Sequence, residues 1–301
     1  MSPYVFITGN GHSGSTLLDL VLGAHPDVIS IGELKQFRRY IEQSKDCTCG
    51  KKVVECPFWL KVQAQIKNKR GIDIFKSQQA FPLTINKSSN RLIQLLRQAL
   101  RIAILNAPSS ISRLLSLVLV HDRAVAINSL SVYDEVLSIS QKKLVVDSSK
   151  TPIVMKMLMI LRPNHVRAIH IVRDGRAVLN SNLKKNRELD FAIKGWVKTL
   201  NLLKLLTSSL SPDRYLTVHY ETFCSDTHNE LVRICEFLGL EYTDRLLDFR
   251  GLERHNIDGN RMRYADTPDI RLDEKWKREL LPHQLRRFNK MAGKLNRKWG
   301  Y

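Results

Sequence analysis

Short apolar runs alternate with helical patterns along the first part of the chain. Tyr4–Thr8 is an apolar run of strand length, and Thr16–Leu22 is rich in leucines, which favour a helix. Ala24–Asp27 interrupts that helix, and Val28–Ile31 is a second, β-branched run. The order strand, loop, helix, strand is typical of two parallel strands joined by a helix. We therefore expect these residues to begin a parallel α/β sheet.

Three later runs have the same strand character. They are Leu144–Val146, Val166–Val172 and Tyr215–Val218. Polar residues follow each run directly, namely Asp147, then Arg173 and Asp174, and last His219, Tyr220 and Glu221. Ligands of open α/β sheets bind outside the carboxyl ends of the strands, so these polar residues are candidates for a binding site.

The segments between the strands are predicted to be helical. Asn90–Leu105 has apolar residues at helical spacing, which we interpret as a core-facing stripe flanked by solvated arginines. Phe191–Ser209 and Thr227–Leu238 have similar patterns, and we expect one terminal helix within Arg271–Tyr301.

The chain shows no internal repeat, low-complexity tract or linker. We expect a single domain over residues 1–301, with a helical insertion at about residues 45–140. The apolar run Leu114–Val120 is too short to span a bilayer, and no signal peptide precedes Tyr4. These features predict a cytoplasmic protein without a transmembrane segment.

Charge narrows the choice of partner. The chain has 48 Lys and Arg against 29 Asp and Glu, a formal net charge of +19. Such an excess favours anionic partners, among them phosphate esters, sulfated or acidic substrates, nucleic acid and a membrane face; solubility alone is the alternative.

A glycine-rich octapeptide fits two phosphate-binding templates. It reads Gly-Asn-Gly-His-Ser-Gly-Ser-Thr from Gly9. Gly9, Gly11 and Gly14 satisfy the dinucleotide pattern G-x-G-x-x-G. Gly9, Gly14 and Thr16 satisfy the P-loop pattern, with Ser15 in place of the lysine. Both templates surround an anion with backbone N–H groups at a helix N-terminus.

The residues around the loop do not decide between the templates. Glu33 stands where the dinucleotide template has its acid, but Leu18 stands where that template has a small residue. The P-loop template lacks the lysine that reaches the β- and γ-phosphates, which argues against an ordinary kinase. The loop still forms a cradle for a phosphate-sized anion.

A second constellation favours a nucleotide with two phosphate positions. Ile169–Ser181 reads as a strand, a charged turn and a helix. Arg173 at the strand end and Ser181 two turns into the helix could face one anion, and a guanidinium with a hydroxyl makes a good phosphate clamp. Two such sites on neighbouring strand ends predict a nucleotide that is phosphorylated at two positions.

These motifs together resemble the sulfotransferases that use 3′-phosphoadenosine 5′-phosphosulfate (PAPS). The octapeptide resembles their 5′-phosphosulfate loop, and Arg173 to Ser181 resembles their 3′-phosphate site. The branch that includes tyrosylprotein and carbohydrate sulfotransferases is suggested by His25–Glu33. Later landmarks are Val146–Pro152, Val218–Glu221 and Cys235–Leu240.

The resemblance implies a three-layer P-loop-like α/β fold, with a central, mostly parallel sheet flanked by helices. PAPS would donate the sulfuryl group to an acceptor hydroxyl and leave as 3′,5′-bisphosphoadenosine, with no metal required. The implied donor-binding residues are Gly11, His12, Ser13, Gly14, Ser15, Thr16, Arg173, Ser181 and Tyr220. The acceptor could be a carbohydrate, a lipid, a metabolite or a tyrosine, and no nucleic acid is expected. We expect residues 45–140, which match no landmark, to determine acceptor specificity.

Catalytic roles are implied for Glu33, Lys150 and His12. Glu33 would be the base, and Lys150 would contact the reacting sulfate and the bridging oxygen. His12 stands where many members of the family have Lys or Arg; with an unperturbed pKa near 6.5, it would be partly charged near neutrality.

Each of these residues also has a structural interpretation. Glu33 could be an acid at a helix N-terminus, and Lys150 a solvated lysine before a turn. Arg173 and Asp174 could form a surface ion pair, and Tyr220 could be a core residue.

Cys47, Cys49 and Cys56 form a cluster that no landmark explains. They could hold zinc with a distant fourth ligand such as a histidine, but their spacing fits no standard zinc motif. Reduced thiols or one local disulfide are therefore the favoured interpretation.

Two other functions remain open. A kinase with an altered P-loop would need Mg²⁺ and an aspartate at a buried strand end, for which Asp147 is the candidate. A non-enzymatic binder of polyanions or nucleic acid would use the basic C-terminal segment and depend steeply on salt.

Overall fold

The predicted parallel sheet is present. The structure is a computed structural model that describes residues 2–76, 80–85, 90–249, 251–264 and 270–301. Among these residues, five strands pair in parallel in the order β2-β3-β1-β4-β5. They are β1 (Tyr4–Gly9), β2 (Val28–Ser30), β3 (Leu144–Asp147), β4 (Val166–Val172) and β5 (Tyr215–His219). All five predicted strand runs are therefore confirmed, within one residue at their ends.

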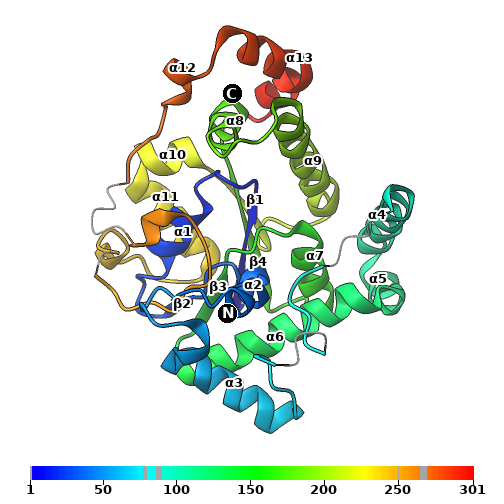
Figure 1. Ribbon diagram of the computed structural model, residues 1–301, viewed down its shortest axis with the longest axis vertical. Helices are drawn as coiled ribbons and strands as arrows, with labels where there is room; N and C mark the ends of the chain where they lie inside the picture. The colour runs from blue at the N-terminus through cyan, green and yellow to red at the C-terminus, as the bar shows by residue number, and fades with distance from the viewer. Residues whose placement is uncertain (1, 77–79, 86–89, 250, 265–269) are drawn as a thin grey trace.

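Helices cover both faces of the sheet (Figure 1). Val5 and Ile7 of β1 point into a core shared with α1 (Ser15–Leu22) and α11 (Thr227–Leu238). Their neighbours Tyr4 and Phe6 point the other way, into a core built largely from the long helices of that face. These are α3 (Pro57–Arg70), α6 (Val120–Ser140) and α7 (Pro152–Leu161). Because side chains alternate along a strand, each strand serves both cores, and the three-layer α/β prediction is confirmed.

A third apolar cluster lies beyond the carboxyl edge of the sheet, at the top of Figure 1. It joins α8 (Gly175–Leu183), α9 (Leu189–Thr207) and α13 (Pro282–Lys298), with Trp196 packed against Phe288 at a centroid distance of 5.7 Å. This cluster positions α8 and α9 beside the strand ends.

The single terminal helix expected within residues 271–301 is wrong. A one-turn helix, α12 (Trp276–Glu279), precedes α13, and the two are separated at Leu280 and Leu281. Pro282 is the reason, since the residue before a proline is pushed out of the helical region; Leu281 has φ −72° and ψ 151°. Pro282 then starts α13 at the position where its missing N–H costs nothing.

The apolar stripe of the helix predicted at residues 90–105 does not face the core. That helix is α4 (Arg91–Asn106), and Leu92 and Leu96 are 65% and 62% exposed. Burial begins only at Ile104, and Arg101, expected to be solvated, pairs with buried Asp122. Helical periodicity predicts that the helix has an apolar face, but it cannot say which face packs against the rest of the molecule.

The remaining helices are short. They are α2 (Phe37–Glu42), α5 (Ser109–Leu115) and α10 (Tyr220–Ser225), with 3₁₀ turns at Leu34–Gln36, Val53–Glu55, Ser116–Val118, Asp244–Leu246 and Arg261–Tyr264. Within the described ranges, no single helix has the length and apolarity needed to cross a membrane. The segments Ile111–Val118 and Val120–Ser140 meet that criterion only together, across a bend of 110°.

Candidate active site

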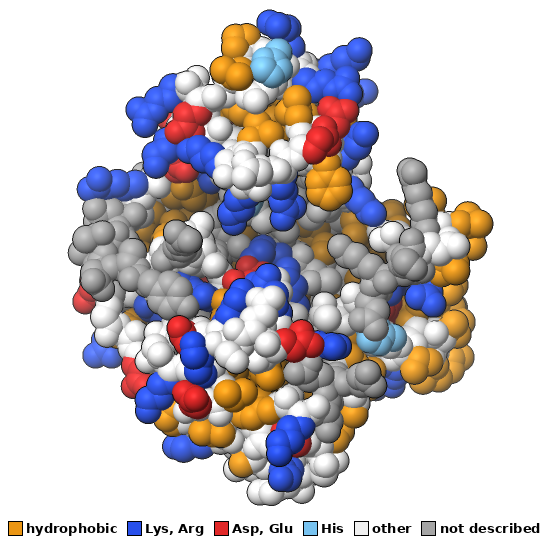
Figure 2. All heavy atoms as spheres, viewed as in Figure 1, with side chains coloured by type: hydrophobic (Ala, Val, Ile, Leu, Met, Phe, Trp, Pro, Cys, Tyr) orange, Lys and Arg blue, Asp and Glu red, His pale blue; other side chains and the backbone are white. Residues whose placement is uncertain are grey.

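A cavity of about 1130 Å³ opens at the carboxyl edge of the sheet. It lies where β1 and β4 are neighbours but lead in opposite directions, β1 toward β2 and β4 toward β5. Such a switch point is the usual ligand site of an open α/β sheet. Figure 2 shows Lys and Arg side chains gathered around a hollow in this face.

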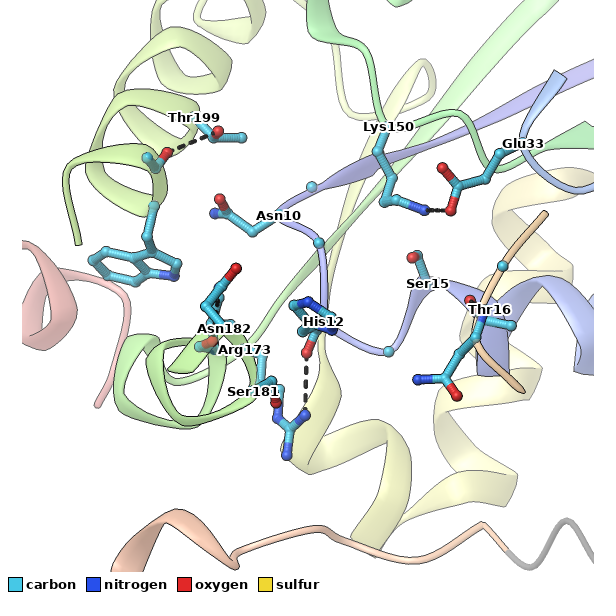
Figure 3. Close-up of a pocket in the computed structure, with 18 of the residues that line it drawn as sticks. Asn10, His12, Ser15, Thr16, Glu33, Lys150, Arg173, Ser181, Asn182 and Thr199 are labelled. Atoms are coloured by element: carbon cyan, nitrogen blue, oxygen red, sulfur yellow. Dashed lines mark hydrogen bonds and ion pairs between the residues drawn. The ribbon is translucent and has the colours of Figure 1, made fainter. Parts of the chain in front are cut away.

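The cavity brings together nearly all of the predicted site residues. The segment that follows each of the five described strands contributes to its wall, and Ser13 is the predicted site residue that does not line it. The lining residues that were predicted are Gly11, His12, Gly14, Ser15, Thr16, Glu33, Lys150, Arg173, Ser181 and Tyr220. In Figure 3, Glu33 and Lys150 lie on one side of the open space, Arg173 and Ser181 on the other, and His12 between them.

The backbone of the loop distinguishes the two phosphate-binding templates. Gly9 and Gly14 have φ values of 143° and 90°, and a Cβ added to either would lie 2.4 Å from the Ile171 oxygen or from the Tyr220 ring, respectively. Gly11 has an ordinary φ and open space around it. The fold thus requires Gly9 and Gly14, the two glycines of the P-loop pattern, and has no steric need for Gly11, the middle glycine of the dinucleotide pattern.

The loop leads into a helix whose N-cap residue is a glycine, which has no side chain to cap it. α1 begins at Ser15, and its N-cap, Gly14, makes no side-chain cap hydrogen bond. The first N–H groups of a helix have no partners within it, so this end of α1 is suited to bind an anion in the cavity. Thr16 also accepts a hydrogen bond from the Asn260 N–H, at 3.1 Å from its Oγ1.

Glu33 is held between two ammonium groups. Lys150 Nζ donates to Glu33 Oε1, and Lys35 Nζ lies 3.3 Å from Oε2. Glu33 stands at the N-cap position of the following 3₁₀ turn, as the structural interpretation expects, but its carboxylate makes no cap hydrogen bond there and pairs with the two lysines instead. The Lys150 side chain is only 9% exposed, which rules out a solvated lysine.

Asp147 organises the turn that presents Lys150. Its Oδ1 accepts the Ser149 N–H at 2.7 Å, and its Oδ2 accepts the Tyr133 hydroxyl at 2.6 Å. Lys150 follows with φ 59°, in the left-handed region. Burial raises the pKa of Asp147, and the residue does not line the cavity. The carboxylate that a kinase would need for Mg²⁺ is therefore committed to the turn.

Arg173 is buried rather than paired on the surface. It lies 4.3 Å over the Tyr220 ring, donates to the His12 carbonyl at 3.1 Å, and has Asp273 Oδ2 3.3 Å away. Its neighbour Asp174 pairs with Arg176 instead. The Ser181 hydroxyl, on α8, donates to the Ala177 carbonyl of the same helix.

His12 differs from its expected charge state. Burial lowers its pKa to about 4, and the nearby charges of Lys185, Arg187, Lys150 and Arg173 lower it in the same direction. The ring is therefore neutral at pH 7 in this structure, rather than partly charged. Its backbone is also in the left-handed region, with φ 68°.

Several charged residues on the wall of the cavity were not predicted from the sequence. Of the described residues on the wall, nine are Lys or Arg and three are Asp or Glu. The missed cations are Lys35, Arg39, Lys185, Arg187, Lys198, Arg271 and Lys275. The basic run at residues 184–187, directly after the predicted phosphate helix, was a signal that could have identified two of them. Within the described part of residues 45–140, only Gln98 reaches the wall.

Comparison with known proteins agrees with this geometry. Residues 3–244 match the model of the sulfotransferase family, which confirms the family resemblance. The structure is similar to the sulfotransferase domain of the Synechococcus PCC 7002 olefin synthase, with 21% identity, a TM-score of 0.60, and coverage of 99% of this chain and 94% of that one. It is also similar to the sulfotransferase domain from the curacin biosynthetic pathway, with 19% identity, a TM-score of 0.55, and coverage of 97% and 98%. No curated protein sequence matches significantly.

Proposed function

The chain belongs to the sulfotransferase family, and from this premise we propose that it transfers a sulfuryl group from PAPS to an acceptor hydroxyl. The observation that carries the proposal is the arrangement of the cavity. The octapeptide loop, Arg173, and the Glu33–Lys150 pair face one space from three sides. This arrangement supports a donor with two separate anionic groups, held beside a base.

In the proposed complex, the loop binds the 5′-phosphosulfate. The backbone N–H groups at the start of α1 and the hydroxyls of Ser15 and Thr16 supply the donors. Arg173 and Ser181 bind the 3′-phosphate. On binding, the phosphate replaces the Asp273 carboxylate as the partner of Arg173, and it replaces the Ala177 carbonyl as the acceptor for the Ser181 hydroxyl. Tyr220 keeps the guanidinium in place by stacking.

The proposed reaction is an in-line displacement at sulfur. The acceptor oxygen forms a bond to sulfur while the bond from sulfur to the 5′-phosphate oxygen breaks, and Glu33 accepts the hydroxyl proton. Lys150 leaves Glu33 and stabilises the charge that develops on the bridging oxygen. The bisphosphate departs from the loop. This chain's residues supply positioning and charge stabilisation, as in phosphoryl transfer.

The cavity has room for both substrates. At about 1130 Å³, it exceeds the usual range of roughly 300–1,000 Å³ for a small-molecule site. Beyond the loop, the wall continues along one side of α9, with Phe191, Lys198 and Thr199. We place the acceptor there, as the hydroxyl of a carbohydrate, lipid, metabolite or tyrosine.

Thermal unfolding with 3′,5′-bisphosphoadenosine tests the donor. Because a ligand at 100 times its Kd stabilises the folded state by about 2.7 kcal/mol, we expect a clear rise in the unfolding temperature with no Mg²⁺ added. ATP with Mg²⁺, and NAD, serve as comparisons. No shift with the bisphosphate together with a shift from ATP and Mg²⁺ would reject the proposal in favour of a kinase.

Arg173 and Arg176 provide a matched pair for the 3′-phosphate. Both are stacked on an aromatic ring at 4.3 Å, but Arg176 pairs with Asp174 and does not line the cavity. Arg173→Ala should weaken bisphosphate binding between about 10-fold and 100-fold, and adenosine 5′-phosphosulfate much less. Arg176→Ala should change neither Kd by more than about 2-fold. Equal weakening of the two nucleotides by Arg173→Ala would place Arg173 away from the 3′-phosphate.

A further inference from the structure

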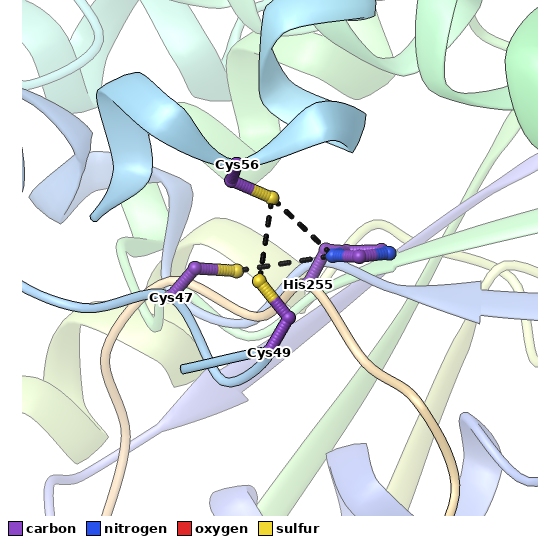
Figure 4. Close-up of side chains that lie close together, drawn as sticks. All are labelled: Cys47, Cys49, Cys56 and His255. Atoms are coloured by element: carbon purple, nitrogen blue, oxygen red, sulfur yellow. Dashed lines mark hydrogen bonds between the residues drawn. The ribbon is translucent and has the colours of Figure 1, made fainter. Parts of the chain in front are cut away.

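Four metal-ligating side chains meet outside the cavity. Cys47, Cys49, Cys56 and His255 place one ligand atom each within 4.8 Å of all the others. Figure 4 shows the three thiols and the imidazole ring directed toward one point, from the segment before α3 and from a segment about 200 residues later in the chain. Cys47 and Cys56 are fully buried, and none of the four lines the cavity.

The spacing of these atoms fits a tetrahedral ion. Zinc–sulfur bonds of about 2.3 Å and zinc–nitrogen bonds of about 2.0 Å place the ligand atoms of a tetrahedron roughly 3.5–3.8 Å apart. Here Cys49 Sγ lies 3.5 Å from Cys56 Sγ, and His255 Nδ1 lies 3.4 Å from Cys56 Sγ and 4.0 Å from Cys47 Sγ. No two of these thiols are bonded, since all are free cysteines.

We propose that Cys47, Cys49, Cys56 and His255 bind one structural zinc ion. Three thiolates and one imidazole form a ligand set typical of zinc, and four protein ligands leave no open position for a substrate. The sequence favoured reduced thiols or a disulfide because the cysteine spacing matches no standard motif. The fourth ligand could not be identified from spacing, because His255 is close to the cysteines only in the folded chain.

The surroundings fix the imidazole before any ion binds. Phe58 stacks on the His255 ring at 4.7 Å, with an angle of 2° between the planes. The Trp59 indole N–H donates to the His255 carbonyl at 2.9 Å. His255 Nε2 lies 3.6 Å from a Glu253 carboxylate oxygen, which is where metal-bound histidines commonly have a carboxylate. Nδ1 is thereby left facing the sulfurs.

The cysteines are also preorganised by their backbone. Cys47 N–H donates to the Lys51 carbonyl at 2.8 Å, and Gly50 N–H donates to the Cys47 carbonyl at 2.9 Å. Gly50 has φ 83°, which closes this turn around the thiols of Cys47 and Cys49. Between those cysteines, Thr48 Oγ1 accepts the Asn256 N–H at 2.8 Å, so the turn is already joined to the residue after His255.

The proposed ion anchors a segment that reaches the active site. After His255, the Asn256 side chain donates to Asp19 and Ser30, and Ile257 pairs with Gly32 and accepts the Glu33 N–H. Asn260 then donates to Thr16 in the loop. Zinc would thus hold residues 255–260 against both the base and the loop. This consequence, unlike the metal site itself, rests on the proposed function.

Metal content tests the site directly. The full chain, produced in zinc-supplemented medium and purified without chelator, should contain about one zinc per molecule by elemental analysis, released on titration with a mercurial. Replacement by Co²⁺ should give the intense visible absorption of a tetrahedral cobalt thiolate. Cys56→Ser and His255→Gln should each lose the metal, whereas Cys224→Ser, a change at a half-buried cysteine outside the cluster, should keep it.

A wild-type protein that contains no zinc and gives no cobalt–thiolate spectrum would overturn the proposal, whether its thiols are reduced or joined in a disulfide. This measurement uses only wild-type protein, so it tests the proposal even if a variant fails to fold. Removal of the metal should lower the unfolding temperature by about 5 °C or more. A zinc-containing protein that does not bind the bisphosphate would keep the metal site and reject the proposed function.

Discussion

Glu33 is held by two lysines, and this arrangement allows its chemical role to be separated from a structural one. Glu33→Gln keeps the size and one acceptor oxygen, which suffices for one of the two lysines, Lys150 or Lys35, but it removes the base. We expect kcat to fall by about 10²- to 10⁴-fold, with bisphosphate Kd changed by less than about 3-fold. The measurements are sulfuryl transfer from PAPS and bisphosphate titration.

A matched control for this variant is Glu42→Gln, which removes an exposed ion pair with Arg38 on a nearby helix. It should leave both parameters unchanged, because exposed pairs contribute little. If Glu33→Gln weakened the bisphosphate as strongly as it slowed transfer, Glu33 would be a structural residue and the assignment as base would fail.

His170 makes the stability of the fold depend on pH. The ring is fully buried on β4, neither nitrogen has a hydrogen-bond partner among the described residues, and Trp299 and Tyr215 pack beside it. Burial lowers its pKa to about 3, with a smaller effect from His219. The unfolded chain binds a proton below about pH 6.5, whereas the folded chain does not until about pH 3. The contribution of His170 to stability is therefore complete above about pH 6.5 and falls with decreasing pH, by up to about 1.4 kcal/mol per pH unit.

His170→Phe isolates this contribution. Its free energy of unfolding in urea should fall less than that of the wild type between about pH 7 and about pH 4.5. The variant must be compared with the wild type because other groups also make stability depend on pH. His12, with a pKa of about 4, lowers stability as the pH falls, as His170 does. Asp19, whose pKa burial raises to about 7, has the opposite effect. Parallel profiles for the two proteins would show that His170 is not the group that titrates.

At the scale of elements, the loop between β1 and α1 can be tested through its glycines. Gly14→Ala would place a Cβ against the Tyr220 ring at a φ of 90°, so it should lower stability by about 1–3 kcal/mol and weaken bisphosphate binding at least 10-fold. Gly11→Ala has open space and an ordinary φ, and should change stability by less than about 0.5 kcal/mol. Equal destabilisation by the two changes would contradict the geometric requirement for the P-loop glycines. Urea unfolding without nucleotide separates stability from binding.

The strands and the loop could be predicted because their signals are local. A β-branched run such as Val166–Val172 has few alternatives, and the left-handed backbone of Gly9 and Gly14 is tied to their residue type. Other features depend on contacts between distant residues. The exposed apolar stripe of α4 has the same sequence pattern as a buried one. His255 is 208 residues from Cys47 in the sequence, and only folding brings the two side chains together.

At the scale of the whole molecule, the positive charge is concentrated where the proposed donor binds. The described wall of the cavity carries six more basic than acidic side chains, part of a formal net charge of +19. Lys185 and Arg187 follow α8 directly, so they are near the proposed 3′-phosphate site without being part of it. A partly enclosed wall of one sign attracts an anion over distances that added salt screens.

The salt dependence of bisphosphate affinity should therefore arise from the basic side chains on the cavity wall and not from the net charge of the protein. We expect Kd to rise about 10-fold between about 0.05 M and about 0.5 M NaCl. A double change, Lys185→Ala with Arg187→Ala, should reduce this dependence. The same loss of two charges on α13, Lys290→Ala with Lys294→Ala, lies outside the cavity and should leave the dependence intact. If both double variants reduced the dependence equally, net charge would govern the attraction, and the basic wall would have no special part in donor binding.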